Sequence, residues 1–141
     1  MLYATAGDMV EQFGEAEMLM LADRGRAGEI DAALVTTALQ KASSEMDAYL
    51  AARYRLPLAD IPDQLVDICC DIARYKLVGA DATETDVARL RYKDAVAKLA
   101  GIRDRKLDIG LTQDGDLLSG GAGVQFSHSP RVFDNAALDG Y

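Results

Sequence analysis

The sequence predicts an all-α protein, a compact bundle of about five helices (two short and three long) with an extended C-terminal arm. In the first two-thirds of the chain, apolar residues recur at spacings of three and four, and glycines and prolines separate these stretches. After Ile102 this spacing ends and glycines become frequent. We therefore expect a helical domain over residues 1–105, followed by a flexible Gly-rich linker and extended arm over residues 106–141.

Composition limits the class of protein. At 141 residues, half of them apolar, the chain has the size and balance of one globular domain. Its net charge of −8 and pI of about 4.5 argue against a main surface that follows nucleic-acid phosphates, although a local basic patch remains compatible.

Compartment and cross-linking can also be predicted. The chain has no apolar run long enough to cross a membrane, and its start lacks the pattern of a signal peptide. Its two cysteines, Cys69 and Cys70, are adjacent, and neighbours on a helix rarely bond to each other. We expect no disulfide framework and a reducing, cytoplasmic compartment.

The first two helices are short. Thr5 is a suitable N-cap, with Asp8 three residues on, for a helix that stops at Gly14. The second helix, residues 15–22, starts with glutamates at its positive end. The glycine-containing loop 23–29 should be exposed, and either mobile or a contact between subunits.

The longest helix should span residues 31–54. Its apolar stripe includes small residues that allow close helix approach, and it comprises Leu34, Val35, Ala38, Leu39, Ala42, Met46, Tyr49, Leu50 and Arg53. The stretch 55–62 ends this helix because the residue before Pro57 disfavours helical geometry. Pro62 suits the first turn of the next helix.

Two further helices complete the domain. The first carries an apolar stripe and stops at Gly79; the stripe is Leu65, Ile68, Cys69, Ile72, Ala73 and Tyr75. Thr83 and Asp86 resemble a capping box that opens the last helix, which should end near Gly101. Its candidate packing residues are Val87, Leu90, Ala95, Val96 and Leu99. We expect the stripes at 34–50, 65–75 and 87–99 to form one core that ends before Ile102.

The C-terminal part has a different pattern. Leu107, Ile109 and Leu111 alternate with other residues, as in a short extended segment. Residues 112–123 contain four glycines and no packing stripe, so we expect a linker there.

No reaction class emerges from the candidate chemical groups. His128, the single histidine, lies between serines without the packed neighbours that a catalytic base needs. Cys69 and Cys70 lack further ligands for zinc, and we interpret them as packing residues. The acidic stretch 112–121 lacks the ligand pattern of a calcium loop. We expect no enzyme, no cofactor and no metal site.

Four stretches together resemble the Mu phage gp36-like family, small virion-morphogenesis proteins of tailed phages and prophages. They are "LYATAGDMVEQFGEAEM", "IDAALVTTALQKASSEMDAYLAARYRLPL", "CCDIARYKL" and "RYKDAVAKL", in consistent order over residues 2–102. The closing "PRVFDNAALDGY" is also similar to the family's C-terminus. More loosely, the helix order resembles the head-to-tail adaptors of long-tailed phages, which form a ring on the portal and hold it with an extended C-terminal arm.

The resemblance implies a structural head-to-tail connector at the head–tail junction of the virion, present in the bacterial host cytoplasm during assembly. Its implied partners are further copies of itself in a ring, twelve in the adaptors, with the portal protein and a stopper or tail-completion protein. DNA would pass through the ring without sequence-specific binding. The arm, loose before assembly and ordered after it, would bind its partner through Val124, Phe126, Arg131, Val132, Phe133, Leu138 and Tyr141.

One alternative is a non-catalytic morphogenesis or DNA-packaging and completion factor. It would contact DNA through the basic face of the last helix, which comprises Arg89, Arg91, Lys93, Lys98, Arg103, Arg105 and Lys106. Carboxylates at Asp86, Asp94 and Asp104 dilute this charge, so a solvated helix face is the simpler interpretation.

Overall fold

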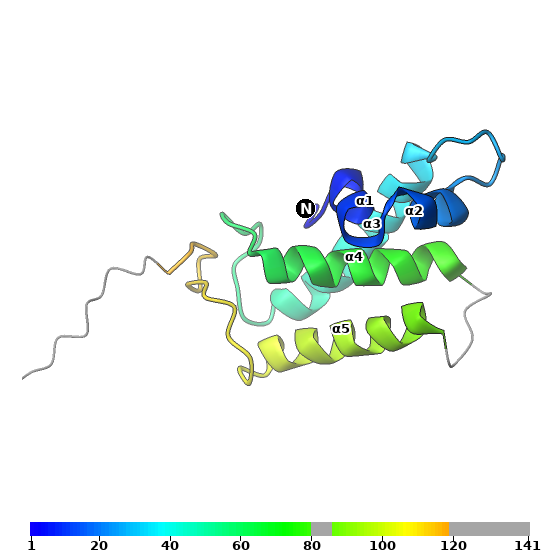
Figure 1. Ribbon diagram of the computed structural model, residues 1–141. Helices are drawn as coiled ribbons and strands as arrows, with labels where there is room; N and C mark the ends of the chain where they lie inside the picture. Colours follow the sequence, from blue (N-terminus) through cyan, green and yellow to red (C-terminus); the bar gives the residue numbers. More distant parts are fainter. Residues whose placement is uncertain (80–85, 119–141) are drawn as a thin grey trace, which may run out of the picture.

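The computed structural model describes residues 1–79 and 86–118 of the chain (Figure 1). In order, the helices of this part are α1 (Ala6–Phe13), α2 (Glu15–Ala22), α3 (Ala32–Leu50), α4 (Asp63–Val78) and α5 (Val87–Arg103). Extended pairing within the described residues consists of one isolated antiparallel bridge, between Leu111 and Leu117. The predicted all-α class, with two short and three long helices, is confirmed.

Helix α4 is the centre of the arrangement, because it packs against all four of the other helices. Helices α4 and α5 run side by side in opposite directions, and α3 packs against both (Figure 1). The short helices α1 and α2 pack on each other and on α3 and α4. The fold is therefore a bundle of three long helices, with the short pair on α3 and α4.

Side chains cap three of the helices at their N-termini, where the first backbone N–H groups have no partner within the helix. Thr5 is the N-cap of α1, as predicted. It forms a capping box with Asp8, in which the Thr5 hydroxyl accepts from the Asp8 N–H and the Asp8 carboxylate accepts from the Thr5 N–H. Asp31 caps α3 by accepting from two backbone N–H groups, and Asp86 caps α5 by accepting from Ala88. Thr83 lies outside the described residues, and α5 begins after Asp86.

The core combines the predicted stripes of α3 and α4 with residues from the N-terminal part of the chain and from the segment after α5. Helix α3 contributes Val35, Ala38, Leu39, Ala42, Met46 and Leu50, and α4 contributes Leu65, Ile68, Cys69, Cys70, Ile72, Ala73 and Leu77. Burial of aliphatic side chains of this size stabilises a fold by about 1.5–3 kcal/mol each. Tyr3 and Met9 join the core from the N-terminus, and Ile109 and Leu111 join it from beyond α5.

Polar contacts join the three long helices on one side. Glu45 on α3 accepts a hydrogen bond from the Tyr92 hydroxyl at 2.7 Å and pairs with Lys76 at 2.8 Å. The rings of Tyr75 on α4 and Tyr92 on α5 stack with centroids 4.3 Å apart. This cluster fixes the relative rotation of α3, α4 and α5 where the apolar stripe of α5 is narrow.

The structure corrects three of the sequence-based predictions. Helix α3 ends at Leu50 and not at Tyr54, so Arg53 lies in the turn after the helix instead of on its apolar stripe. Val87 and Leu90 are 56% and 50% exposed, because only the face of α5 with Ala88, Ala95 and Leu99 turns inward.

The third correction concerns where the core ends. It does not end before Ile102, because Ile109 and Leu111 are buried in it. The packed part of the chain therefore continues past residue 105 into the segment 106–118, whose contacts define the first of the candidate surfaces.

Candidate interaction surfaces

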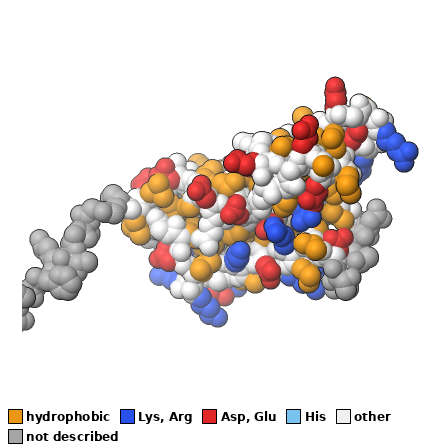
Figure 2. All heavy atoms as spheres, in the orientation of Figure 1, with side chains coloured by type: hydrophobic (Ala, Val, Ile, Leu, Met, Phe, Trp, Pro, Cys, Tyr) orange, Lys and Arg blue, Asp and Glu red, His pale blue; other side chains and the backbone are white. Residues whose placement is uncertain are grey.

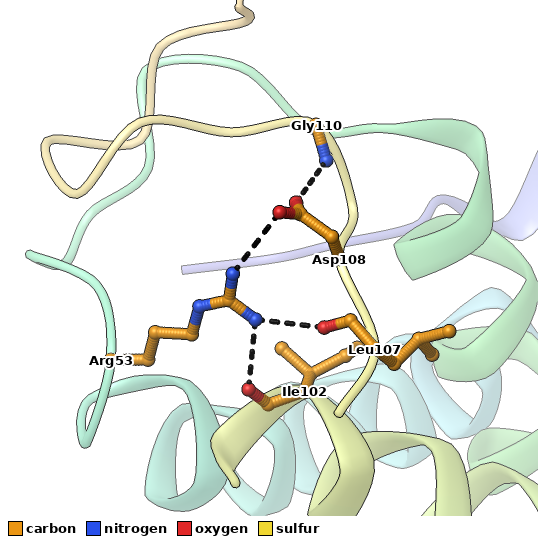
Figure 3. A network of polar contacts seen from close by, with 5 residues as sticks. All are labelled: Arg53, Ile102, Leu107, Asp108 and Gly110. Carbon is orange, nitrogen blue, oxygen red and sulfur yellow. Dashed lines mark hydrogen bonds and ion pairs between the residues drawn. The ribbon is translucent and has the colours of Figure 1, made fainter. Parts of the chain in front are cut away.

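Arg53 holds the segment after α5 against the helices (Figure 3). Its guanidinium donates from one nitrogen to the carbonyl oxygens of Ile102 at 3.0 Å and Leu107 at 2.7 Å. Its other terminal nitrogen lies 3.5 Å from the carboxylate of Asp108, which in turn accepts from the backbone N–H of Gly110. One largely buried side chain in the turn after α3 thus fixes the direction in which the chain leaves α5.

Backbone hydrogen bonds attach the next residues to the loop between α3 and α4. Arg55 donates to the carbonyl of Gln113 at 2.9 Å, and Asp60 donates to that of Gly115 at 3.1 Å. The carboxylate of Asp60 also accepts from the backbone N–H of Leu117. We call residues 106–118 the docked segment, because it is anchored at both of its ends.

Gly115 allows the closest approach in the docked segment. Its φ of 84° lies in the left-handed region, and a Cβ at this position would lie 2.9 Å from Cδ2 of Leu58 and 3.0 Å from its Cα. Any larger residue would push the segment away from the loop. The sequence-based interpretation of residues 112–118 as linker missed this contact, because a single glycine at a tight turn has no periodic pattern.

A small cationic hollow lies beside the docked segment. Its volume is about 190 Å³, and it is lined by Arg53, Tyr54, Arg105, Leu111 and Gln113. The hydroxyl oxygen of Tyr54 is buried and has no hydrogen-bond partner among the described residues. Burial raises the pKa of this hydroxyl, since the charged form would lose its hydration.

The basic face of α5 is partly neutralised by neighbouring carboxylates. Arg91 lies 3.6 Å from Asp71 of α4, and Arg103 pairs with the adjacent Asp104 at 2.8 Å. Desolvation raises the pKa of Asp71, while the nearby Arg91 opposes this shift. These pairings reduce the positive electrostatic potential that would attract DNA phosphates. The basic face of α5 therefore has the character of a solvated helix face more than of a nucleic-acid interface.

A larger hollow of about 410 Å³ lies between α1 and the start of α4, lined by Asp8, Glu11, Gln12, Asp63, Val66 and Asp67. Its four carboxylates are spread over two helices, a grouping that the linear sequence does not show. Exposed Asp and Glu side chains are also visible in the space-filling view (Figure 2). The described residues contain no group of three or more side chains arranged to hold a metal ion.

The cysteines are packing residues. Cys69 and Cys70 are both buried and free, and the hydroxyl of Ser43 lies 3.6 Å from the sulfur of Cys69. Burial raises the pKa of both thiols, that of Cys70 to about 12. Since a thiolate is the reactive form, neither cysteine is set up as a nucleophile.

The predicted partner-binding residues and His128 lie outside the described residues. These are Val124, Phe126, Arg131, Val132, Phe133, Leu138 and Tyr141. Their assignment as binding residues remains a prediction. The structure places Leu118, the last described residue before them, which donates a backbone hydrogen bond to Gly110 at 2.9 Å.

In the described part of the chain, no helix is both long and apolar enough to cross a membrane.

The loop 23–29 is largely exposed, as predicted. The carboxylate of Asp23 shapes it by accepting hydrogen bonds from the backbone N–H groups of Ala27 and Gly28. Whether this loop is mobile or contacts another subunit stays a prediction.

Comparison with known proteins places this helical fold in a class of bacteriophage proteins. Over residues 3–128 the chain matches the protein family described as Bacteriophage Mu, Gp36. The chain belongs to this family, as its resemblance to the Mu phage gp36-like proteins predicted.

Two relatives support the assignment. The chain is 31% identical over 140 residues to the Mu-like prophage FluMu protein gp36 of Haemophilus influenzae, which covers 99% of this chain and 98% of that protein. It is 37% identical over 112 residues to gene product J of Escherichia phage Mu, which covers 79% of this chain and 78% of that protein.

Proposed function

We propose that this chain is a non-catalytic structural protein of a phage virion, a head-to-tail connector that forms a ring on the portal protein. Membership of the Mu Gp36 family is the observation that carries the proposal. The proposed location is the head–tail junction of the virion, after assembly in the host cytoplasm. The proposed partners are identical copies, the portal, and a stopper or tail-completion protein, with DNA passing through the ring.

The docked segment supports an arm that starts from a fixed point. Arg53 and the hydrogen bonds to Asp60 hold residues 106–118 in place, so Leu118, after which the proposed arm would begin, has a defined position. The six apolar residues that we predict to bind a partner follow directly in sequence.

A free-energy comparison favours a partner outside the same chain. Full burial of an aliphatic or aromatic side chain contributes about 1.5–3 kcal/mol, whereas ordering one residue's backbone costs about 1–2 kcal/mol. Six such side chains among 23 residues (119–141) do not clearly offset that cost in one chain. A neighbouring subunit or the portal adds strand pairing, and a ring adds a high local concentration of arms.

Truncation tests the proposal. We expect a chain that ends after Leu118 to melt at the temperature of the full chain, because the docked segment is retained. The same truncation should abolish joining to the portal or to other copies, and particles should fail at head-to-tail assembly. Phe133→Ala and Tyr141→Ala should each reproduce part of the defect, since aromatic anchors carry a large share of interface energy.

The controls separate the arm from the body. A strong fall in melting temperature after truncation would mean that residues 119–141 pack on their own domain. Normal assembly without them would contradict a role as connecting arm. Labelling the protein in intact virions, together with its native mass in solution, tests the proposed location and ring.

A morphogenesis or DNA-packaging factor is the second candidate, because seven basic residues lie between Arg89 and Lys106. Salt dependence distinguishes the two functions. Binding through phosphates weakens steeply with salt, whereas docking through apolar groups does not. The pairing of Arg91 with Asp71 and of Arg103 with Asp104 favours the connector.

A further inference from the structure

We propose that the cationic hollow lined by Arg53, Tyr54 and Arg105 is a binding site for a carboxylate side chain from a second copy of this chain. The inference deepens the proposed function, because it names a contact between the copies of the ring. Three features of the described residues carry it: an unpartnered hydroxyl, a local excess of positive charge, and unpaired carboxylates elsewhere on the molecule.

The hydroxyl of Tyr54 is the first feature. The residue is only 4% exposed, and its oxygen has no hydrogen-bond partner among the described residues. Leaving such a group unpaired destabilises a protein, and a phenylalanine at this position would avoid the loss. Exceptions to pairing concentrate at functional sites, so this residue, which lines a hollow, points to a ligand that accepts a hydrogen bond.

The charges around the hollow are the second feature. Arg53 and Arg105 both line it, and Asp108 is paired with Arg53 at 3.5 Å. Arg105 is exposed and forms no ion pair with a described residue. Gln113 adds an amide donor and Leu111 an apolar wall, a combination suited to one carboxylate on a short aliphatic stem.

A volume of about 190 Å³ holds a single acidic side chain and is too small for a stretch of nucleic-acid backbone. The chain itself has a surplus of carboxylates, with 23 acidic against 15 basic residues. Glu11, Asp63 and Asp67, all exposed around the acidic hollow, form no ion pair with any described residue. Such unlike patches on one chain suit a head-to-tail contact, the kind of contact that closes a ring.

The test compares two variants of the full chain with a matched control. Tyr54→Phe removes only the hydroxyl, and Arg105→Gln removes the charge while keeping the length of the side chain. Lys106→Gln is the control, because it removes a neighbouring exposed charge that does not line the hollow. Self-association is measured by sedimentation equilibrium, and folding by thermal melting.

We expect Tyr54→Phe to melt at an equal or higher temperature and yet to associate about tenfold more weakly, as for loss of one charge-assisted hydrogen bond. Arg105→Gln should weaken association similarly, and Lys106→Gln should leave it unchanged. Equal association of all four proteins overturns the proposal, as does a wild-type chain that stays monomeric. Arg105→Gln keeps the test decisive if Tyr54→Phe fails to fold.

Small anions identify the chemistry of the site. Sodium acetate should shift the NMR signals of the Tyr54 ring and the Leu111 methyl groups in a saturable way, and this response should disappear in Tyr54→Phe. A stronger response to inorganic phosphate would overturn the carboxylate assignment in favour of a nucleic-acid backbone. Failed assembly after deletion of residues 119–141, with normal assembly of Tyr54→Phe, would refute this inference and leave the proposed function standing.

Discussion

The helical body and the docked segment 106–118 are both packed parts of one molecule, but different interactions hold them. Helices α3 and α4 meet through apolar stripes, and their backbone groups are paired within each helix. The docked segment buries few side chains, chiefly Ile109 and Leu111, and depends on Arg53 and on backbone bonds to the α3–α4 loop. Disturbing apolar burial should therefore unfold the whole domain, whereas disturbing single polar contacts should release only the segment.

Leu39→Asp should have the largest effect. Leu39 is 2% exposed on α3, and burying a carboxylate without a partner costs several kcal/mol, a large share of a total stability of about 5–15 kcal/mol. We expect loss of the helical circular-dichroism signal. Thr36→Asp is the control, since it adds the same charge on an exposed position of α3. A folded Leu39→Asp variant with unchanged melting would refute the core described here.

Arg53→Met should destabilise the protein by about 2–4 kcal/mol, because the carbonyls of Ile102 and Leu107 lose their charged donor. Methionine keeps an aliphatic stem of similar length, so packing is largely preserved. Urea denaturation measures the loss. Hydrogen exchange should show faster exchange at the backbone N–H groups of Asp60 and Leu118, with α3 and α4 still protected.

Arg55→Met is the matched control for that experiment. Arg55 is 86% exposed, and its ion pair with Asp114 at 3.4 Å contributes little in water. We expect a change below about 0.5 kcal/mol. Similar losses in the two variants would mean that Arg53 acts only as another surface charge.

Gly115→Ala should destabilise by about 1–3 kcal/mol, from backbone strain at positive φ and from the clash with Leu58. Gly28→Ala separates these two causes, because Gly28 has a similar φ of 78° with open space around it. The difference between the two melting temperatures reports the clash alone. If both variants melt alike, Gly115 is required only for its conformation.

The sequence predicts the elements that have a regular spacing of apolar residues, and it misses contacts that have no such spacing. The spacing of apolar residues predicted α3 and α4 and their stripes, and local capping chemistry predicted the start of α1 at Thr5. Arg53 was placed on the stripe of α3 because its spacing continues the pattern, although the helix ends three residues earlier at Leu50. Its true partners are carbonyl groups 49 and 54 residues away, and backbone carbonyls carry no sequence signal.

Spacing along the chain also did not predict which face of α5 turns inward, or where the hollows lie. Val87 and Leu90 fit a helical period, but the inner face of α5 rests mainly on small residues such as Ala88 and Ala95. The cationic hollow joins Tyr54 with Arg105 and Gln113, which lie 51 and 59 residues further along the chain, and the turn after α5 and the docked segment bring them together.

The smallest expected effect is a change in the pH dependence of stability within the body. Desolvation, with the hydrogen bond to Glu45, raises the pKa of Tyr92 from 10.0 to about 12. The folded state therefore holds this proton more tightly than the unfolded state. The resulting stabilisation is fully present below pH 10 and is lost as the pH rises towards 12. In urea denaturation, the free energy of unfolding of Tyr92→Phe should fall less steeply with pH across this window than that of the wild type. Because Tyr92 is only partly buried, the difference in slope should be small.

Tyr49→Phe is the control for this experiment. Tyr49 lies on the same side of α3 as Glu45, and its hydroxyl donates no hydrogen bond to a described carboxylate. Equal slopes for Tyr92→Phe and the wild type would show that the Tyr92–Glu45 contact does not persist in solution.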